Sequence, residues 1–211
     1  GLQDAVNLAW KLAAVLSDGA DRALLDTYSA ERVPVGQALL ATTRMATTLV
    51  ELSNPAVDDH LPAVFATINA LPPLFHAMQQ GFLGGMSGLG IAYPASPLTV
   101  HDSDTQRGGP APGQRLAQVR AADADAPGWQ AVLAALRQPG WSLLTTGTDP
   151  RSVAPGFATL CVVVGPTAAA LGLDDAGGQD PAWLLVRPDG YLAGRGYGQA
   201  QLDTAVARMP L

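Results

Sequence analysis

Cysteine is almost absent from this sequence of 211 residues, which contains only Cys161. A single thiol excludes a disulfide within the chain and a metal site built from cysteines. Because Cys161 lies in the apolar run from Leu160 to Val164, we expect a buried and unreactive side chain. Sparse cysteine is also typical of the reducing cytoplasm, where we place this protein.

Positive charge is scarce as well. Lysine and arginine together number 12, Lys11 is the only lysine, and the formal net charge is -6. No run of five basic residues exists, so the chain lacks the clustered cations that bind nucleic acid or an anionic membrane surface. It also lacks the uncharged apolar run of about 18 residues that a membrane-spanning helix needs, and the basic leader segment of a signal peptide. We therefore predict no nucleic-acid partner and no membrane partner.

The common catalytic patterns are missing too. His60, His76 and His101 lie far apart, and none has a partner at metal-ligand spacing. Ser87 stands in the sequence GMSGL, whereas a nucleophile elbow needs a second glycine two residues after the serine. The glycine-rich residues 194–198 do not match G-x-G-x-x-G and favour a turn. We predict no catalytic residue and no metal-ligating residue in this chain.

Helical periodicity dominates the first part of the sequence. Apolar residues recur at spacings of three and four over residues 2–16, which builds one apolar face, and Gly19 follows as a stop signal. Proline is favoured at the first position of a helix, so we expect one helix to end before Pro34 and another to begin there. The further helices predicted span residues 23–32, 34–52 and 59–80, and an irregular connection spans 81–97.

Strand-like runs dominate after residue 97. We predict strands at 115–120, 141–146, 160–164, 183–187 and 191–193, with helices at 129–137 and 199–209. Pro188-Asp189-Gly190 predicts a tight turn, because proline presets φ and glycine accepts a positive φ. The pattern indicates an α/β (α+β) fold in which residues 98–211 form a small thioredoxin-like α/β domain. Without a C-x-x-C pair, such a domain cannot exchange thiols.

Four stretches resemble one enzyme family, in the order in which that family has them. They are GLQDAVNLAWKLA at 1–13, LLDTYSAERVPVG at 24–36, MSGLGIAYP at 86–94 and LLVRPDGYLA at 184–193. They are similar to the p-hydroxybenzoate-hydroxylase-like FAD-dependent monooxygenases, in particular to the branch acting on aromatic polyketides and substituted phenols. The resemblance implies that residues 1–97 are the last helices of an FAD-binding domain with a connector, and that 98–211 are the family's C-terminal domain.

The resemblance also implies cofactors. Family members reduce FAD with NAD(P)H and pass one oxygen atom of O2 to an aromatic substrate. It places Gly1, Leu2 and Gln3 beside the flavin, chiefly through backbone N–H groups at a helix N-terminus, which favour negative charge. The family's G-x-G-x-x-G, its Gly-Asp motif and its substrate-binding sheet have no counterpart in these 211 residues. We therefore expect a C-terminal fragment that is inactive alone and binds neither FAD nor NAD(P)H. Its partner is then the missing N-terminal part of the same protein, and the parent binds the aromatic substrate.

Taken one at a time, the same stretches also have purely structural interpretations. Val6, Leu12 and Leu16 would pack a core, and Glu31 and Arg32 would form a local ion pair or helix-end contacts. In this interpretation the residues identify the family without performing its chemistry.

A second hypothesis is a stand-alone, non-catalytic thioredoxin-like module that binds a partner or forms a homodimer. Residues 2–16 separate the two hypotheses. In an enzyme fragment their apolar face is left uncovered, whereas in a module it is covered within the chain or by a symmetric copy. The start at Gly1 inside a helical pattern and the four ordered matches favour the fragment. Substrate identity, hydroxylation versus Baeyer–Villiger insertion, and NADPH versus NADH stay open.

Overall fold

The computed structural model describes the two ends of the chain and parts of the sequence between them. The described residues are 1–51, 62–63, 88, 90–101, 108–116, 123–146, 158–173 and 180–209. The chain divides into two compact units, of which one is Gly1–Glu31 with Ala92–Leu211 and the other is Arg32–Ile91. The first unit carries the sheet and the candidate site described below.

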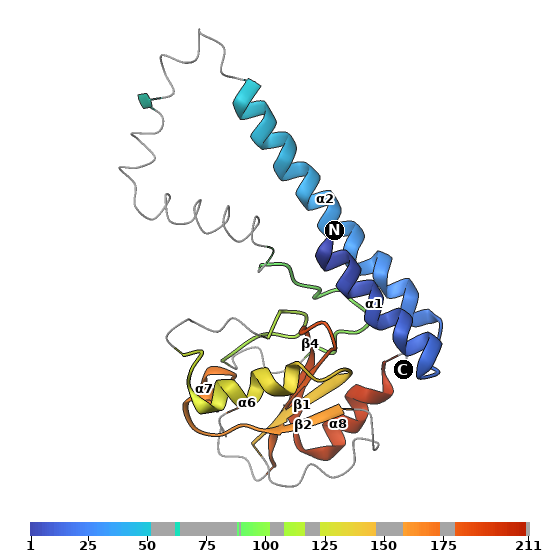
Figure 1. The fold of residues 1–211 in the computed structure, drawn as a ribbon, viewed down its shortest axis with the longest axis vertical. Helices are drawn as coiled ribbons and strands as arrows, with labels where there is room; N and C mark the ends of the chain where they lie inside the picture. Colours follow the sequence, from blue (N-terminus) through green and yellow to red (C-terminus); the bar gives the residue numbers. More distant parts are fainter. Residues whose placement is uncertain are drawn as a thin grey trace. The chain divides into compact units, whose positions relative to one another are not determined.

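A four-stranded mixed sheet forms the centre of the first unit (Figure 1). Its strands are β1 (Trp141–Thr145), β2 (Ala158–Val162), β3 (Ala182–Val186) and β4 (Leu192–Tyr197). The spatial order is β2-β1-β3-β4, in which only the β1–β2 pair is parallel. Every residue of the inner strands β1 and β3 is buried, because helices cover both faces of the sheet. The mixed α/β class predicted from the sequence is confirmed.

Helices pack on both faces of this sheet. The helices α6 (Pro127–Leu136) and α7 (Gly165–Ala170) cover one face, and α8 (Gly198–Ala207) covers the other. Successive side chains of a strand point to opposite faces, so Leu144 joins the core under α6 and α7 while Leu143 joins the core under α8. The short helix α7 was not predicted from the sequence.

The hairpin between β3 and β4 has the turn that the sequence predicts. The amide of Gly190 donates to the carbonyl oxygen of Arg187 at 2.9 Å, and Gly190 has a φ of +80°. The amide of Arg187 donates in turn to the carbonyl oxygen of Tyr191 at 2.9 Å. Both backbone groups of Arg187 are thus bonded within the turn, which holds this residue in a fixed place at the end of the sheet.

The first helix, α1 (Leu2–Ser17), buries its polar side and exposes its apolar side. Its buried residues are Asn7 and Lys11, whereas Leu2, Val6 and Leu16 are 82%, 47% and 79% exposed. The expectation that Val6, Leu12 and Leu16 pack a core is therefore wrong within this chain. The reason is that α1 meets the sheet unit with the face that carries Asn7 and Lys11, so the apolar stripe points away.

The second helix, α2 (Ala23–Glu51), is continuous where the sequence predicts a break. Asp21 stabilises its start, since Oδ1 accepts a hydrogen bond from the amide of Ala23 at 2.9 Å. Pro34 lies inside the helix rather than at the start of a new one. Proline removes one intrahelical hydrogen bond, but its fixed φ is helical, so the neighbouring bonds can carry the helix through.

Other predicted boundaries shift or fall on residues that are not described. In the predicted strand 115–120, Arg115 forms an isolated bridge with Tyr191, and residues 117–120 lie outside the described residues. The predicted helix 59–80 also lies outside them, apart from helical residues 62–63. The compact units do not follow the predicted division at residue 97, because residues 1–31 pack with the C-terminal part. That division stays a prediction about the domains of a longer protein.

Candidate functional site

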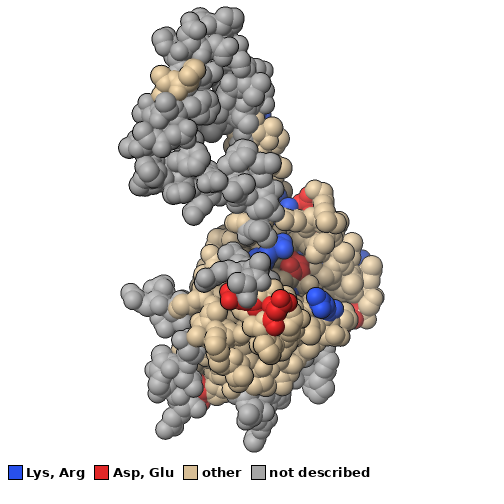
Figure 2. Space-filling model, turned by 60° about the vertical axis from the view of Figure 1, so that its left-hand side comes forward, with Lys and Arg blue, Asp and Glu red and all other residues tan. Residues whose placement is uncertain are grey.

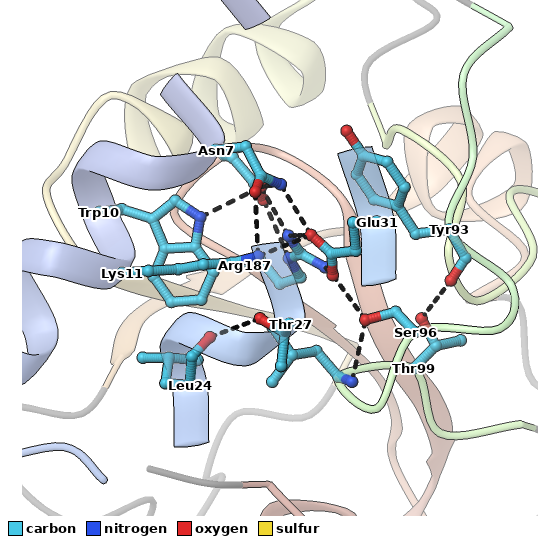
Figure 3. Close-up of polar contacts among 12 residues, drawn as sticks. Asn7, Trp10, Lys11, Leu24, Thr27, Glu31, Tyr93, Ser96, Thr99 and Arg187 are labelled. Atoms are coloured by element: carbon cyan, nitrogen blue, oxygen red, sulfur yellow. Dashed lines mark hydrogen bonds and ion pairs between the residues drawn. The ribbon is translucent and has the colours of Figure 1, made fainter. Parts of the chain in front are cut away.

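A buried cluster of polar side chains joins α1, the N-terminal part of α2 and the β3–β4 turn (Figure 3). We call it the Glu31 network, and it consists of Asn7, Trp10, Lys11, Glu31, Ser96, Arg187 and Asp189. The side chains of Lys11 and Glu31 are 0% exposed, that of Arg187 is 1% and that of Asp189 is 2%. Two cations thus balance two anions, which is the condition under which such groups are buried.

The helix α1 contributes three side chains from a single face. Asn7, Trp10 and Lys11 are spaced three and four residues apart, so they lie together on the helix surface. The amide nitrogen Nδ2 of Asn7 donates to Glu31 Oε2 at 2.7 Å and to Asp189 Oδ2 at 3.3 Å. Trp10 Nε1 donates to the same Asp189 oxygen at 3.1 Å. Lys11 Nζ donates to Glu31 Oε2 at 2.8 Å and to Asn7 Oδ1 at 2.9 Å.

Arg187 lies between the two carboxylates and binds both. Its terminal nitrogens donate to the two oxygens of Glu31 at 2.5 and 2.9 Å. Its Nε and one terminal nitrogen donate to the oxygens of Asp189 at 3.0 and 2.7 Å. A guanidinium that binds two carboxylates in this forked manner is held in one orientation, because its donors are planar and fixed.

Aromatic rings enclose the guanidinium of Arg187. Its carbon Cζ lies 5.4 Å from the ring centres of Trp10 and Tyr93 and 5.8 Å from that of Tyr191. Rings at this distance attract a cation and exclude water from it. Trp10 in turn packs edge-on against Trp141 of β1, at 5.9 Å between ring centres.

The segment before residue 100 ties the network to the sheet. The hydroxyl of Ser96 donates to Glu31 Oε1 at 2.5 Å and accepts from the amide of Leu98 at 3.1 Å. Further along, the amide of Val100 donates to the carbonyl oxygen of Ala193 in β4 at 2.7 Å. Glu31 is therefore contacted from α1, from the hairpin and from this segment.

The charges in the network shift the pKa values of its members. Burial would raise the pKa of Glu31, but the hydrogen bonds and charge of Arg187, with bonds from Asn7 and Lys11, outweigh it and lower the pKa to about 2. Burial would lower the pKa of Arg187, and Asp189 and Glu31 together raise it instead. For Lys11, burial dominates and lowers the pKa despite its bond to Glu31. Glu31 and Arg187 are thus both charged at neutral pH.

The residues predicted to contact flavin lie at the N-terminus of α1. Gly1 is the N-cap of the helix, and its carbonyl oxygen accepts the first backbone bond from Ala5 at 3.0 Å. Gly1 and Leu2 are exposed, and Gln3 is half-buried. The Glu31 network does not include them. Their contact with FAD stays a prediction.

Only some of the other side chains considered in the sequence are among the described residues. No three His, Cys, Asp or Glu side chains of this part of the chain are placed to hold a metal ion. Cys161 is 8% exposed and burial raises the pKa of its thiol, which confirms the prediction of a buried thiol. His60, His76 and Ser87 lie outside the described residues.

No helix in the described ranges is long and apolar enough to cross a bilayer. On the face drawn in Figure 2, the described acidic and basic side chains form small separate groups among uncharged residues. Such a face lacks the continuous basic surface that phosphate backbones require.

Sequence reasoning missed the Glu31 network. The sequence predicts a local ion pair or helix-end contacts for Glu31 and Arg32, whereas Glu31 binds Arg187 across 156 positions of the chain. A signal was nevertheless present. Asn7 and Lys11, the latter the only lysine, stand at i and i+4, so the spacing places an amide and a cation side by side on one face of the helix.

Comparison with known proteins gives these features a family context. Residues 1–43 match the family model described as FAD binding domain. Over 99% of its length the chain is 40% identical to 6-methylpretetramide 4-monooxygenase of Streptomyces rimosus, and covers 40% of that protein. The 12-dehydrotetracycline 5-monooxygenase/anhydrotetracycline 6-monooxygenase of Streptomyces rimosus subsp. rimosus is 31% identical over 91% of the chain and 35% of its own length.

A solved structure agrees with these sequence matches. The structure of the rebeccamycin biosynthetic enzyme RebC with reduced flavin superposes on this chain with a TM-score of 0.59. The two sequences are 25% identical, and the match covers 93% of this chain and 38% of the RebC chain. The chain spans about 40% of the length of the relatives it matches. In the matched FAD-binding region, in sequence and in fold, this chain is thus similar to part of the FAD-dependent aromatic and polyketide monooxygenases.

Proposed function

We propose that this chain is the C-terminal part of an FAD-dependent monooxygenase that uses NAD(P)H and O2 to oxygenate an aromatic or polyketide substrate. The observation that carries the proposal is the uncovered apolar face of α1, on which Leu2 is 82% and Leu16 is 79% exposed. A helix that buries a lysine and exposes leucines requires a further apolar surface against its other side. The match of residues 1–43 to an FAD-binding domain supports the rest of that domain as this surface.

The contribution of the chain to flavin binding is then limited to one helix end. FAD, when bound, supplies electron transfer from NAD(P)H and activation of O2. The exposed N-terminus of α1 fits a supporting role, because amides in the first turn of a helix stabilise nearby negative charge by about 0.3–1 kcal/mol. Gly1, Leu2 and Gln3 would act there through their backbone. The sequence has no glycine-rich phosphate loop, so FAD, NAD(P)H and substrate are held by the remainder of the parent.

The sheet unit serves as a scaffold in this proposal. The order β2-β1-β3-β4, with one parallel pair, a C-terminal hairpin and a final helix, supports the thioredoxin-like arrangement expected from the sequence. Because the chain has one cysteine, this unit performs no thiol exchange. The scarcity of cysteine in the sequence supports a cytoplasmic location.

The substrate class follows from the names of the relatives. Two of them act on 6-methylpretetramide and on anhydrotetracycline, according to their names. We therefore propose a fused-ring aromatic polyketide rather than a simple phenol as the substrate class for the parent.

The longer protein that carries this chain provides the test. It should purify with FAD and, when supplied with NAD(P)H, O2 and anhydrotetracycline, add one oxygen atom to the substrate, as mass spectrometry of the product would show. The 211-residue chain alone should bind no flavin. A longer protein that does not bind added FAD would refute the proposal. A chain that forms a stable dimer with the apolar face of α1 protected from hydrogen exchange would favour a non-catalytic module.

A further inference from the structure

The geometry points to Arg187 and Asp189 as positioning residues for the flavin. We infer that these two side chains of the β3–β4 turn, acting through the Glu31 network, set the orientation of α1 and thereby the place of its N-terminus. The inference rests on the proposed function, since it concerns how this chain supports bound FAD. The inference gives the β3–β4 hairpin a specific task, which is to hold α1 in place. The hairpin lies about 180 residues along the chain from Gly1 to Gln3.

Directional polar contacts hold α1 against the sheet and its hairpin, beside the packing of Trp10 on Trp141. Asn7 and Lys11 are its two buried residues, and each donates to a buried carboxylate. Trp10, from the same face, donates to Asp189 at 3.1 Å. Hydrogen bonds to charged groups require particular distances and angles, so rotation of the helix or sliding along its axis would break several of them together.

The carboxylates and the guanidinium are themselves fixed to the sheet. Arg187 is bonded at both its backbone groups within the turn that joins β3 to β4. Its side chain binds Glu31 and Asp189 in forked pairs while three aromatic rings surround it. The end of the hairpin therefore fixes the position of α1, and the hairpin itself is hydrogen-bonded into a sheet with a buried core.

The distance from this anchor to the helix end is short. Asn7 lies five residues after Leu2, which corresponds to about 7.5 Å along an α-helix. A helix is stiff over such a length, so a tilt at the anchor passes to the first turn with little damping. The apolar face of α1 does not set this geometry within the described residues, because Leu2, Val6 and Leu16 are exposed there.

Two mild substitutions in the longer, FAD-containing protein test the inference. Asp189→Asn keeps the shape of the side chain but removes its charge, and Trp10→Phe keeps the ring against Trp141 but removes the N–H that Asp189 accepts. Asp203→Asn, at an exposed position of α8, is the matched control. The readouts are the FAD dissociation constant, the flavin absorption spectrum and the fraction of NAD(P)H oxidation that yields hydrogen peroxide instead of product.

We expect Asp189→Asn and Trp10→Phe to weaken FAD binding by about two- to fivefold, the factor that corresponds to losing a helix-terminus contribution. Both should also shift the flavin spectrum and raise the peroxide fraction, at temperatures where the proteins are folded, while Asp203→Asn changes none of these. Variants that melt at lower temperature but keep the wild-type dissociation constant, spectrum and peroxide fraction would show that the network is only structural, and the proposed function would stand. A wild-type protein that binds no FAD would remove both the proposed function and the inference.

Discussion

Replacing Arg187 by methionine removes the cation on which two buried carboxylates depend. In the native network the charges of Lys11 and Arg187 balance those of Glu31 and Asp189. Arg187→Met leaves one cation against two anions, in a place where Glu31 is 0% and Asp189 is 2% exposed. Breaking a buried pair in this way typically destabilises a protein by about 3–5 kcal/mol, because an uncompensated charge stays out of water.

We therefore expect Arg187→Met to lower the free energy of unfolding by about 4 kcal/mol. Since single domains are stable by only about 5–15 kcal/mol, this is a large part of the total. Urea unfolding of the 211-residue chain, followed by tryptophan fluorescence, measures the change. Arg208→Met, at an exposed position after α8, is the matched control and should change the free energy by less than about 0.5 kcal/mol.

A double variant checks that charge balance is the cause. Glu31→Met with Arg187→Met leaves Lys11 against Asp189 and so restores neutrality. The double variant should be less destabilised than the sum of the two single variants by about 1–3 kcal/mol. Additive effects, or a loss below about 1 kcal/mol for Arg187→Met alone, would refute the view that the network is a mutually compensating charge cluster.

The remaining predictions concern pH, backbone conformation, thiol reactivity and the free face of α1. The pKa of Glu31 is lowered from 4.5 to about 2. The stability that its charge supplies is therefore present above about pH 5 and is lost as pH falls toward 2. When urea midpoints are measured over this pH range, Glu31→Gln should lose less stability than the wild-type chain. Gly190 has a φ of +80°, so Gly190→Ala should destabilise by about 1–2 kcal/mol, whereas Gly36→Ala, in open space on α2, should stabilise by up to about 1 kcal/mol. Cys161 should react with a colorimetric thiol reagent much more slowly in the folded chain than in urea, and equal rates would contradict its burial. Leu16→Ser should change the stability of the isolated chain by less than about 0.5 kcal/mol, because Leu16 is 79% exposed, but should weaken FAD retention in the longer protein.

Local signals made the hairpin and the first helix predictable. A turn such as Pro188-Asp189-Gly190 is specified by residues that are adjacent in sequence, since proline and glycine restrict φ wherever they stand. The period of α1 likewise predicts a helix, whatever that helix packs against. The same period does not reveal which face is covered, because the pattern is identical whether the covering surface lies in this chain or elsewhere.

Non-local and marginal features escaped the sequence. The prediction of a break before Pro34 relied on the frequent place of proline at a helix start, and α2 shows that a helix can continue through it. The six residues of α7 are too few for a helical period to be recognised. The bond between Glu31 and Arg187 depends on how three elements meet in space, which the spacing of residues along the chain does not encode.

The Glu31 network explains why polar residues occur in three of the four family-like stretches. The first stretch contains Asn7, Trp10 and Lys11, the second contains Glu31, and the fourth contains Arg187 and Asp189. Interpreted singly, they looked like unrelated structural residues. In space they form one buried cluster that fixes a helix belonging to the FAD-binding match.

The intact mass of the native polypeptide that carries this chain, measured together with its visible absorption, tests the central claim most directly. We predict a mass well above the 21.7 kDa of the 211 residues and a flavin absorption band at about 450 nm. A native polypeptide of 21.7 kDa without flavin absorbance would contradict the claim that this chain works as part of an FAD-dependent monooxygenase.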